Sequence, residues 1–401
     1  MKIFGISPWG NLWDAKGGGA STLYNLIKGF IDAGHEVHLV CPFDRKENIV
    51  LKDLHVHRFK LPFSNLRSNI RILNRIYSKI SYFLFILLAM RKSLEIAKKT
   101  KPDIVYGFAN SGTVTAYFIA KIKNIPNITR LYGTFLYPFV NHPIQLLLRF
   151  DEVIAFKTPC KYLIITNDGT KGDEVAKSLK VSPERIKFWM NGVDDMYDPN
   201  FNTEEFKKSI GISEDKKIVL SVSRLVGWKR VDRIINAIPS VVSQYKDAIF
   251  LVVGDGEERN NLENLANKLN IKDYIKFIGA VSHEKIIEYM NSADIFISMY
   301  NLSNMGNPLL EAMRCGKCII TLNTGTTGEI IKNNKNGILL DTDNVNEVSG
   351  AIIKLLNDEK LRKTLGINVR EYASNHFQGW NERIQMEINL IERIRNKNGK
   401  K

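Results

Sequence analysis

The sequence has few cysteines and no apolar run long enough to span a membrane. Its four cysteines are Cys41, Cys160, Cys315 and Cys318. They are too few and too scattered for the disulfide framework of a secreted protein, and no apolar, cleavable leader follows Met1. We therefore expect a protein that stays in a reducing compartment. Cys315 and Cys318 have the spacing of a metal-binding pair, but no second pair or histidines accompany them, and buried small residues are the alternative interpretation.

Acidic residues are scarce in the first part of the chain. Residues 1–150 hold 21 Lys and Arg against 8 Asp and Glu, whereas the remainder holds 36 against 34. Residues 58–101 contain 11 basic residues and a single acidic one, Glu95. Such a stretch indicates an anionic partner, for example a phospholipid surface or a lipid phosphate. Nucleic acid is not expected, because few aromatic residues interleave with the cluster and no nucleic-acid-binding motif is present.

The basic stretch also has a helical period, which predicts an amphipathic helix over residues 70–99. At 100° per residue, four basic residues share one arc: Arg67, Arg71, Arg75 and Lys79. The apolar residues on the other arc are Ile70, Leu73, Ile76, Tyr77, Ile80, Phe83, Leu84 and Leu87. The apolar run 80–90 is shorter than the ~20 residues that cross a bilayer. The helix can therefore dock on a membrane surface or pack in a core with its basic face in solvent.

Short β-rich runs alternate with helical patterns in two series. The first series has strands at 2–7, 36–41, 103–106, 162–166 and 186–189, and helices at 21–33, 70–99 and 173–179. The second has strands at 217–222, 248–253, 275–278, 295–298 and 318–321, and helices at 231–244, 259–269, 283–291, 308–314 and 327–332. The turn-rich segment 191–200 between them is a linker. The pattern predicts an α/β chain with two Rossmann-like, doubly wound parallel-sheet domains facing a cleft. They cover residues 1–195 and 203–375, and 376–401 forms a C-terminal helix and basic tail.

Ligands of open parallel sheets bind beyond the C-terminal ends of the strands, and two loops there carry suitable groups. Gly17–Gly19 precedes a helix, where free amides favour an anion; a plain tight turn is the alternative. Arg224 and Lys229 stand five residues apart where a strand ends. They can converge on one diphosphate, the Arg by paired hydrogen bonds and the Lys as a point charge. A solvated pair of surface cations is the alternative.

A third loop begins a helix at Gly306, Asn307 and Pro308, so its amides can face phosphate oxygens. Glu311 lies about one turn further, where a carboxylate can accept two sugar hydroxyls; a favourable contact with the helix dipole is the alternative. Neither half has the Gly-x-Gly-x-x-Gly fingerprint with a later acidic residue, which argues against a nicotinamide dehydrogenase.

The motifs, taken in order, resemble those of retaining glycosyltransferases of the GT-B fold, family four (group 1 glycosyltransferases). They are Gly17–Gly19, Gly34–Val40, Asn191–Asp194, Ser223-Arg224 with Lys229, Val252–Gly256, Phe277–Gly279, Ala293–Ser298, Glu311–Gly316 and Thr324–Glu329. The resemblance covers nearly the whole chain. Each motif is loose, but their order and spacing together are specific.

The resemblance implies that the second domain binds a nucleotide-diphosphate sugar, with a UDP-sugar expected. Arg224 and Lys229 would hold the diphosphate and stabilise the leaving group, with no metal or other cofactor. The other implied donor-binding residues are Gly18, Gly19, Phe277, Ile278, Gly279, Ser303, Gly306, Asn307, Leu309, Leu310 and Glu311. Among them Glu311 would bind the ribose. Tyr132, Gly133 and Thr134 would lie on the acceptor or sugar side, and the C-terminal helix would pack back on the first domain.

Two positions depart from the family pattern. Ser303 stands eight positions before Glu311, where the family usually has a sugar-contacting Glu. Tyr132 stands where the family tends to have a His; a Tyr can donate a hydrogen bond but cannot act as a near-neutral base. As a hypothesis, the loss of the Glu suits an acidic donor sugar or one with fewer hydroxyls.

The first domain must then supply the acceptor site. Its basic helix and the aromatic-rich segment 132–143 fit a lipid-linked acceptor, such as a polyprenyl-diphosphate saccharide or a glycolipid, while a soluble polysaccharide precursor is the alternative. We expect an enzyme that is peripheral on the cytoplasmic face of the cell membrane and contacts its anionic surface. A non-catalytic relative that binds a membrane or a partner is the competing interpretation.

Overall fold

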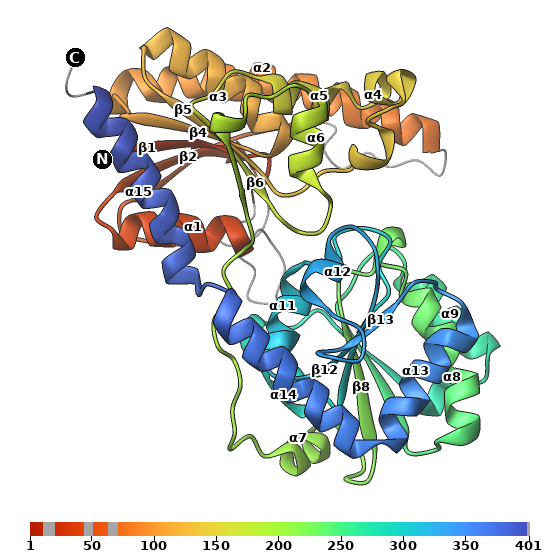
Figure 1. Cartoon of the computed structure of the whole chain (residues 1–401). Coiled ribbons are helices and arrows are strands. Elements are labelled where there is room, and N and C mark those ends of the chain that lie inside the picture. Colours follow the sequence, from red (N-terminus) through yellow and green to blue (C-terminus); the bar gives the residue numbers. More distant parts are fainter. Residues whose placement is uncertain (11–20, 44–50, 63–70, 399–401) are drawn as a thin grey trace.

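The computed structural model of the chain has two α/β domains, each built on one parallel sheet (Figure 1). It describes residues 1–10, 21–43, 51–62 and 71–398. The doubly wound fold predicted from the alternating pattern is confirmed. In both sheets the central strands are short apolar runs buried on both faces, as parallel strands between two helix layers must be, whereas the edge strands are only partly buried.

The first domain contains a seven-stranded sheet with the order β3-β2-β1-β4-β5-β6-β7, and every neighbouring pair is parallel. Its strands are β1 Lys2–Ile6, β2 Glu36–Pro42, β3 Leu54–Phe59, β4 Ile104–Phe108, β5 Asn127–Leu131, β6 Tyr162–Thr166 and β7 Ile186–Trp189. Its helices are α1 Ser21–Asp32, α2 Arg71–Thr100, α3 Ala109–Lys123, α4 Pro143–Leu148, α5 Phe150–Lys157, α6 Gly172–Ser178 and α15 Trp380–Asn398. Helix α1 packs on one face of the sheet together with α15, and α2 and α3 pack on the other.

The second domain contains a six-stranded sheet with the order β10-β9-β8-β11-β12-β13, again all parallel. Its strands are β8 Lys217–Val222, β9 Ala248–Val253, β10 Ile275–Gly279, β11 Ile295–Ser298, β12 Cys318–Leu322 and β13 Ile338–Leu340. Its helices are α7 Thr203–Ser209, α8 Val231–Gln244, α9 Arg259–Lys268, α10 His283–Ser292, α11 Asn307–Arg314, α12 Thr327–Ile330, α13 Val345–Asn357 and α14 Glu359–His376. The two sheets repeat one strand order, in which the first strand of each domain stands at the centre.

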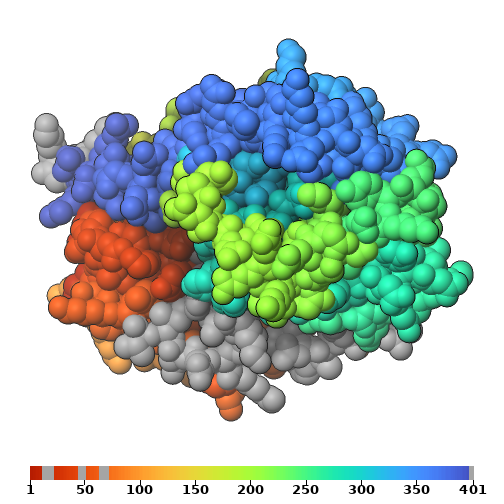
Figure 2. Space-filling model, turned by 90° about the horizontal axis from the view of Figure 1, so that it is seen from below, coloured from red at the N-terminus to blue at the C-terminus, as the bar shows by residue number. Residues whose placement is uncertain are grey.

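The chain crosses between the domains twice. After β7 it passes into the second domain, and after α14 it returns to form α15 against the first domain. The two crossings are hydrogen-bonded to each other, with Val193 N donating to Gln378 O at 2.9 Å and Trp380 N donating to Asp194 Oδ1 at 2.9 Å. Figure 2 shows the dark-blue atoms of α15 lying on the red atoms of α1. The C-terminal helix is thus part of the first domain's core, as Ile388 and Ile391 are buried there.

Five strands and helices of the first domain are not among those predicted from the sequence: β3, β5, α3, α4 and α5. All four cysteines lie in the described residues and none of them forms a disulfide; Cys315 and Cys318 are buried. Burial raises the pKa of each of these two thiols to about 12, so both are inert side chains of the core. Among the described residues, no helix combines the length and apolar character needed to cross a membrane.

Candidate active site

A cavity lies between the domains, where the strand order of each sheet reverses. In the first sheet β1 pairs with both β2 and β4, and in the second β8 pairs with both β9 and β11. At this point the chain leaves the two neighbouring strands in opposite directions, and this opens a crevice at their C-terminal ends. The cavity has a volume of about 910 Å³ and is lined by Trp9 after β1, Asn110 after β4, Arg224 after β8 and Ser303 after β11. The two crevices therefore face each other across one site.

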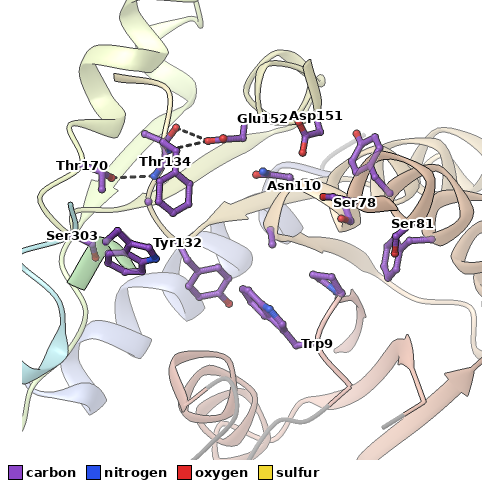
Figure 3. Close-up of a pocket in the computed structure, with 18 of the residues that line it drawn as sticks. Trp9, Ser78, Ser81, Asn110, Tyr132, Thr134, Asp151, Glu152, Thr170 and Ser303 are labelled. Atoms are coloured by element: carbon purple, nitrogen blue, oxygen red, sulfur yellow. Dashed lines mark hydrogen bonds between the residues drawn. The ribbon is translucent and has the colours of Figure 1, made fainter. Parts of the chain in front are cut away.

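The wall from the first domain is a hydrogen-bonded loop that follows β5 (Figure 3). The buried Glu152 carboxylate of α5 accepts hydrogen bonds from Thr134 Oγ1 at 3.0 Å and from Phe135 N at 2.9 Å. Thr134 N donates to Thr170 Oγ1 at 3.0 Å. Burial raises the pKa of Glu152. The loop is held from two sides, which fixes the backbone around Tyr132 against the cavity.

Asp168 is a cavity residue that the sequence analysis missed. Its Oδ1 accepts a hydrogen bond from Thr170 Oγ1 at 2.6 Å, and the Ser303 side chain lies close enough to lower the pKa of this carboxyl. Burial raises the pKa of Asp168, and the charge of Lys229 opposes that shift. Gly133 has a φ of +94°, and a Cβ there would lie 2.4 Å from Asp168 Oδ2, so only glycine fits. The Asn167-Asp168-Gly169 turn after a buried strand is the signal that could have identified this residue.

The wall from the second domain carries the two predicted cations. Arg224 is exposed, and its guanidinium lies 5.9 Å from the centre of the Trp228 ring. Lys229 is buried, with its Nζ 3.8 Å from the centre of the Tyr300 ring and 3.4 Å from the Ser303 carbonyl oxygen. Burial lowers the pKa of Lys229 to about 7, with Arg224 adding to the effect and Asp168 opposing it. Arg224 lines the cavity and Lys229 contacts the lining residue Ser303, so positive charge on this side could attract an anion.

Direct contacts between the domains close the bottom of the cavity. Met305 N donates to Asp168 O at 3.0 Å. Gly325 and Gly169 lie so close that a Cβ on Gly325, where φ is +61°, would stand 1.8 Å from the Gly169 oxygen. Across the opening, the rings of Phe135 and Trp228 are 6.1 Å apart. The two domains thus touch each other beside the cavity.

Glu311 lies in α11, outside the residues that line this cavity. It is buried, and its Oε1 is 3.1 Å from His283 Nε2 at the start of α10. The hydrogen bond that His283 donates to this carboxylate raises the pKa of His283. The sequence analysis did not identify His283. Strand β10 ends with the predicted Phe277, Ile278 and Gly279, and its C-terminal end leads into α10.

Contrary to the prediction from the sequence, the first amides of α11 are not all free to bind phosphate. Leu309 N and Leu310 N both donate to the Gly306 carbonyl oxygen, at 3.1 and 3.4 Å. Asn307 Oδ1 accepts a hydrogen bond from Asn191 Nδ2 in the linker at 2.8 Å. The helix start is therefore tied to the interdomain linker.

Of the predicted site residues, the cavity brings together Arg224, Ser303, Tyr132, Gly133 and Thr134. Lys229 adjoins them through its contact with Ser303. Gly18 and Gly19 lie outside the described residues, as does Arg67. The phenol of Tyr132 is held against Trp9, with ring centroids 4.9 Å apart, and burial raises its pKa to about 12.

Helix α2 separates the cavity from an exposed apolar surface. Asn74, Ser78 and Ser81 line the cavity. The exposed apolar residues of the helix are Ile72, Ile76, Ile80, Phe83 and Leu87, between 44% and 68% exposed. Most of the apolar arc predicted from the sequence therefore faces outward, while Tyr82, Phe85 and Ala89 pack inward.

The basic residues predicted along one edge of α2 do not all carry a charge that faces solvent. Lys79 forms an ion pair with Asp151 and lies 4.7 Å from the centre of the Phe150 ring, so its charge is neutralised inside the domain. Arg75 is exposed, and Arg71 is the first residue of the helix. Wheel geometry placed Lys79 correctly on the helix but could not show that Asp151 packs beside it.

Two family models match the chain one after the other. The description "Glycosyltransferase Family 4" matches residues 16–196, and "Glycosyl transferases group 1" matches residues 202–372. Together they span both domains and meet at the linker.

Individual relatives align over most of the chain. N-acetyl-alpha-D-glucosaminyl L-malate synthase of Bacillus anthracis is 27% identical, over 96% of each chain. UDP-Gal:alpha-D-GlcNAc-diphosphoundecaprenol alpha-1,3-galactosyltransferase of Escherichia coli is 23% identical, over 85% of each chain. The crystal structure of Anabaena Alr3699/HepE in complex with UDP and glucose superposes with a TM-score of 0.73 at 19% identity, covering 97% of this chain and 100% of that one.

Proposed function

The chain belongs to glycosyltransferase family 4, in group 1 of the glycosyl transferases, and on that premise we propose that it moves a sugar from a UDP-sugar, with retention of configuration, to a lipid-linked acceptor at a membrane surface. Membership of this family implies the transfer of a sugar from a nucleotide sugar. The nucleotide, the stereochemistry and the acceptor are our proposal. We also propose that the enzyme is bound peripherally to the cytoplasmic face of the cell membrane.

The donor's diphosphate binds between Arg224 and Lys229. Both cations stand at the end of β8, and Lys229 is held in a desolvated site where its attraction for a dianion is strong. As the bond from the sugar to the diphosphate breaks, negative charge grows on the leaving oxygen beside these groups. We propose that they supply this stabilisation without a metal ion. The ribose binds at Glu311, and the base binds next to Phe277–Gly279.

The sugar itself lies near Ser303 and Asp168. Ser303 takes the place of the family's usual carboxylate, but the Asp168 carboxyl of the first domain lines the same cavity and lies close enough to Ser303 for this side chain to lower its pKa. A carboxylate accepts hydrogen bonds from sugar hydroxyls and repels a second carboxylate. We therefore favour a neutral donor sugar over the acidic one suggested by the sequence.

The acceptor proposal rests on a single observation, the two faces of α2. One face lines the cavity with Asn74, Ser78 and Ser81, and the adjoining face exposes a stripe of apolar residues. Phe83 of that stripe stacks on Phe150, with ring centroids 5.7 Å apart, and α4 adds the exposed Ile144 and Leu147. An exposed apolar patch beside a polar site suits an amphipathic acceptor whose head enters the cavity while its tail stays in the membrane.

Donor specificity is tested first by thermal unfolding of the purified protein against UDP-, GDP- and ADP-sugars. A donor at 100 times its dissociation constant should stabilise the protein by ~2.7 kcal/mol. We expect UDP-sugars to do so, and Arg224→Ala and Glu311→Ala to remove the effect. NMR of the product's anomeric proton reports retention. Stabilisation by GDP- or ADP-sugars alone contradicts the UDP proposal, and no product with any donor would favour the non-catalytic alternative.

Metal independence is tested by assaying product formation after brief EDTA treatment. We expect activity to be retained, because Arg224 and Lys229 carry the charge stabilisation. If EDTA removed the activity and Mg²⁺ or Mn²⁺ restored it, the proposal of metal independence would be contradicted.

Membrane docking is tested by co-sedimentation with phosphatidylglycerol vesicles. Replacing Ile76, Ile80 and Phe83 together by Asn should release the protein from the vesicles while leaving UDP-sugar binding unchanged. The matched control is Ile367→Asn, because Ile367 of α14 is 67% exposed and lies in the other domain. Equal vesicle binding by the triple variant and the control would exclude the α2 surface as the docking site.

A further inference from the structure

The edge of the first sheet carries a cluster of histidines that the proposed reaction does not use. Three of the chain's seven histidines, His38, His55 and His57, lie on β2 and β3 together with Glu36. Residues two apart on a strand share a face, and His38 pairs with His55 in the parallel register. All four side chains therefore stand on the face of the sheet that α2 covers.

The imidazole and carboxylate groups converge on one point. His38 Nε2 lies 2.8 Å from Glu36 Oε1, and His55 Nε2 lies 3.7 Å from the same oxygen. The three ligand atoms lie within 4.8 Å of one another. Tetrahedral Zn²⁺ bonds of 2.0–2.1 Å require ligand atoms about 3.3 Å apart, so small side-chain rotations bring all three to an ion.

The surroundings orient the ligands. His38 is 5% exposed, and its Nδ1 lies 3.1 Å from His57 Nε2, which leaves Nε2 facing Glu36. A metal-binding histidine commonly uses its second ring nitrogen in this way, which fixes the ring and the tautomer. On ion binding, His38 would move its proton from Nε2 to Nδ1 and donate to His57. His57 packs beneath α2, where Lys92 and Glu95 are its nearest charged neighbours from that helix.

Access and charge also suit a cation. The His55 side chain is 50% exposed, so an ion can enter from solvent and keep a water molecule as its fourth ligand. Lys2 Nζ lies 3.7 Å from Glu36 Oε2, on the carboxylate oxygen that faces away from the histidines. The lysine therefore partly neutralises Glu36 but does not occupy the oxygen that the histidines share.

We propose that Glu36, His38 and His55 form a Zn²⁺-binding site that joins the edge strand β3 to β2. Two imidazoles and one carboxylate, with a position open to water, are a ligand set that Zn²⁺ accepts. The site lies at the amino-terminal ends of the strands, opposite the end that faces the cavity. It stabilises the first domain and takes no part in sugar transfer, so it stands independently of the proposed function.

The test is metal binding by the full chain after chelation and desalting. Competition with a chromophoric chelator should show one equivalent of Zn²⁺, and Co²⁺ in its place should give the strong visible absorption of a tetrahedral site. His55→Gln and Glu36→Gln should each weaken binding by at least ~100-fold, more than the 10–100-fold typical of groups that only orient a ligand. His57→Gln should fall within that smaller range.

The matched control is His376→Gln, since His376 is exposed at the end of α14 in the other domain. It should bind Zn²⁺ like the unmodified protein. Zn²⁺ should also raise the thermal midpoint of the unmodified chain and not that of His55→Gln. Absence of Zn²⁺ binding in the unmodified chain, or equal binding in His55→Gln and His376→Gln, would show that the cluster is only a set of hydrogen-bonded histidines.

Discussion

Lys229 keeps its ammonium group in a site that disfavours charge. Its pKa is lowered to about 7, chiefly by burial, so in the free enzyme it is charged below pH 7 and largely neutral above pH 8. Bound diphosphate favours the charged form, so donor binding above pH 7 takes up a proton. The donor's dissociation constant should therefore rise with pH above about 7, by up to tenfold per unit. Calorimetric titration with a UDP-sugar between about pH 6 and 9 measures this slope.

The control for this prediction is Lys229→Arg. A guanidinium stays protonated across the whole range, so this variant should bind the donor with an affinity that changes little with pH. If both proteins show the same slope, the proton is taken up elsewhere in the site.

Helix α15 is anchored by a buried cluster of three charges. Glu387 of this helix pairs with Arg383 at 3.0 Å and with Arg130 of β5, and all three side chains are at most 3% exposed. Removing the carboxylate leaves two buried guanidinium groups without a counter-charge. Glu387→Ala should therefore lower the free energy of unfolding of the first domain by about 3–5 kcal/mol, measured by urea denaturation.

Glu392→Ala is the matched control, because Glu392 lies on the exposed side of the same helix. Its effect should stay within about 0.5 kcal/mol. Equal destabilisation by the two substitutions would mean that α15 is held by its apolar residues alone.

Elements with a clear hydrophobic period were predictable, and those with polar interruptions were not. The predicted β1 and β9 coincide closely with observed strands, because their apolar runs are bounded by turns. Strand β3 has the sequence Leu-His-Val-His-Arg-Phe, in which three histidine or arginine side chains conceal the alternation. Strand β5 contains Arg130, which is acceptable inside the protein only because Glu387 arrives from the far end of the chain. No local pattern contains that information.

The candidate site was predictable where one loop carries the chemistry. Arg224 and Lys229 could be predicted as site residues because they are two cations close together after the end of one strand. Asp168 and His283 were missed because each matters through a partner from a distant segment, Ser303 and Glu311 respectively. The outward direction of the apolar face of α2 depends on how the helix docks, which its own period does not fix.

The two domains pack backbone against backbone at Gly169 and Gly325. A methyl group on Gly325 would overlap the Gly169 oxygen, so Gly325→Ala should push the domains apart and open the cavity. Because a displacement of about 1 Å can cost ~100-fold in rate, we expect kcat/KM to fall by 10- to 100-fold with little change in the thermal midpoint. Steady-state kinetics and solution X-ray scattering measure the two effects.

Gly350→Ala provides the comparison, because no atom lies within 4 Å of a Cβ at this position in α13. It should leave kcat/KM unchanged and stabilise the second domain by roughly 0.5–1 kcal/mol. Unchanged activity in Gly325→Ala would show that catalysis does not require the closed contact.

The position of α15 also sets an order of events during synthesis. Ile384, Ile388, Ile391 and Ile394 complete the apolar core against α1, although nearly the whole chain separates them from it. While the ribosome translates the second domain, the first domain exposes the surface that α15 will cover. The second domain contains its own core within residues 193–377 and can fold before the chain is finished. The part of the protein that is made first is therefore the last to be complete, and its exposed surface is the one that a chaperone would meet on the nascent chain.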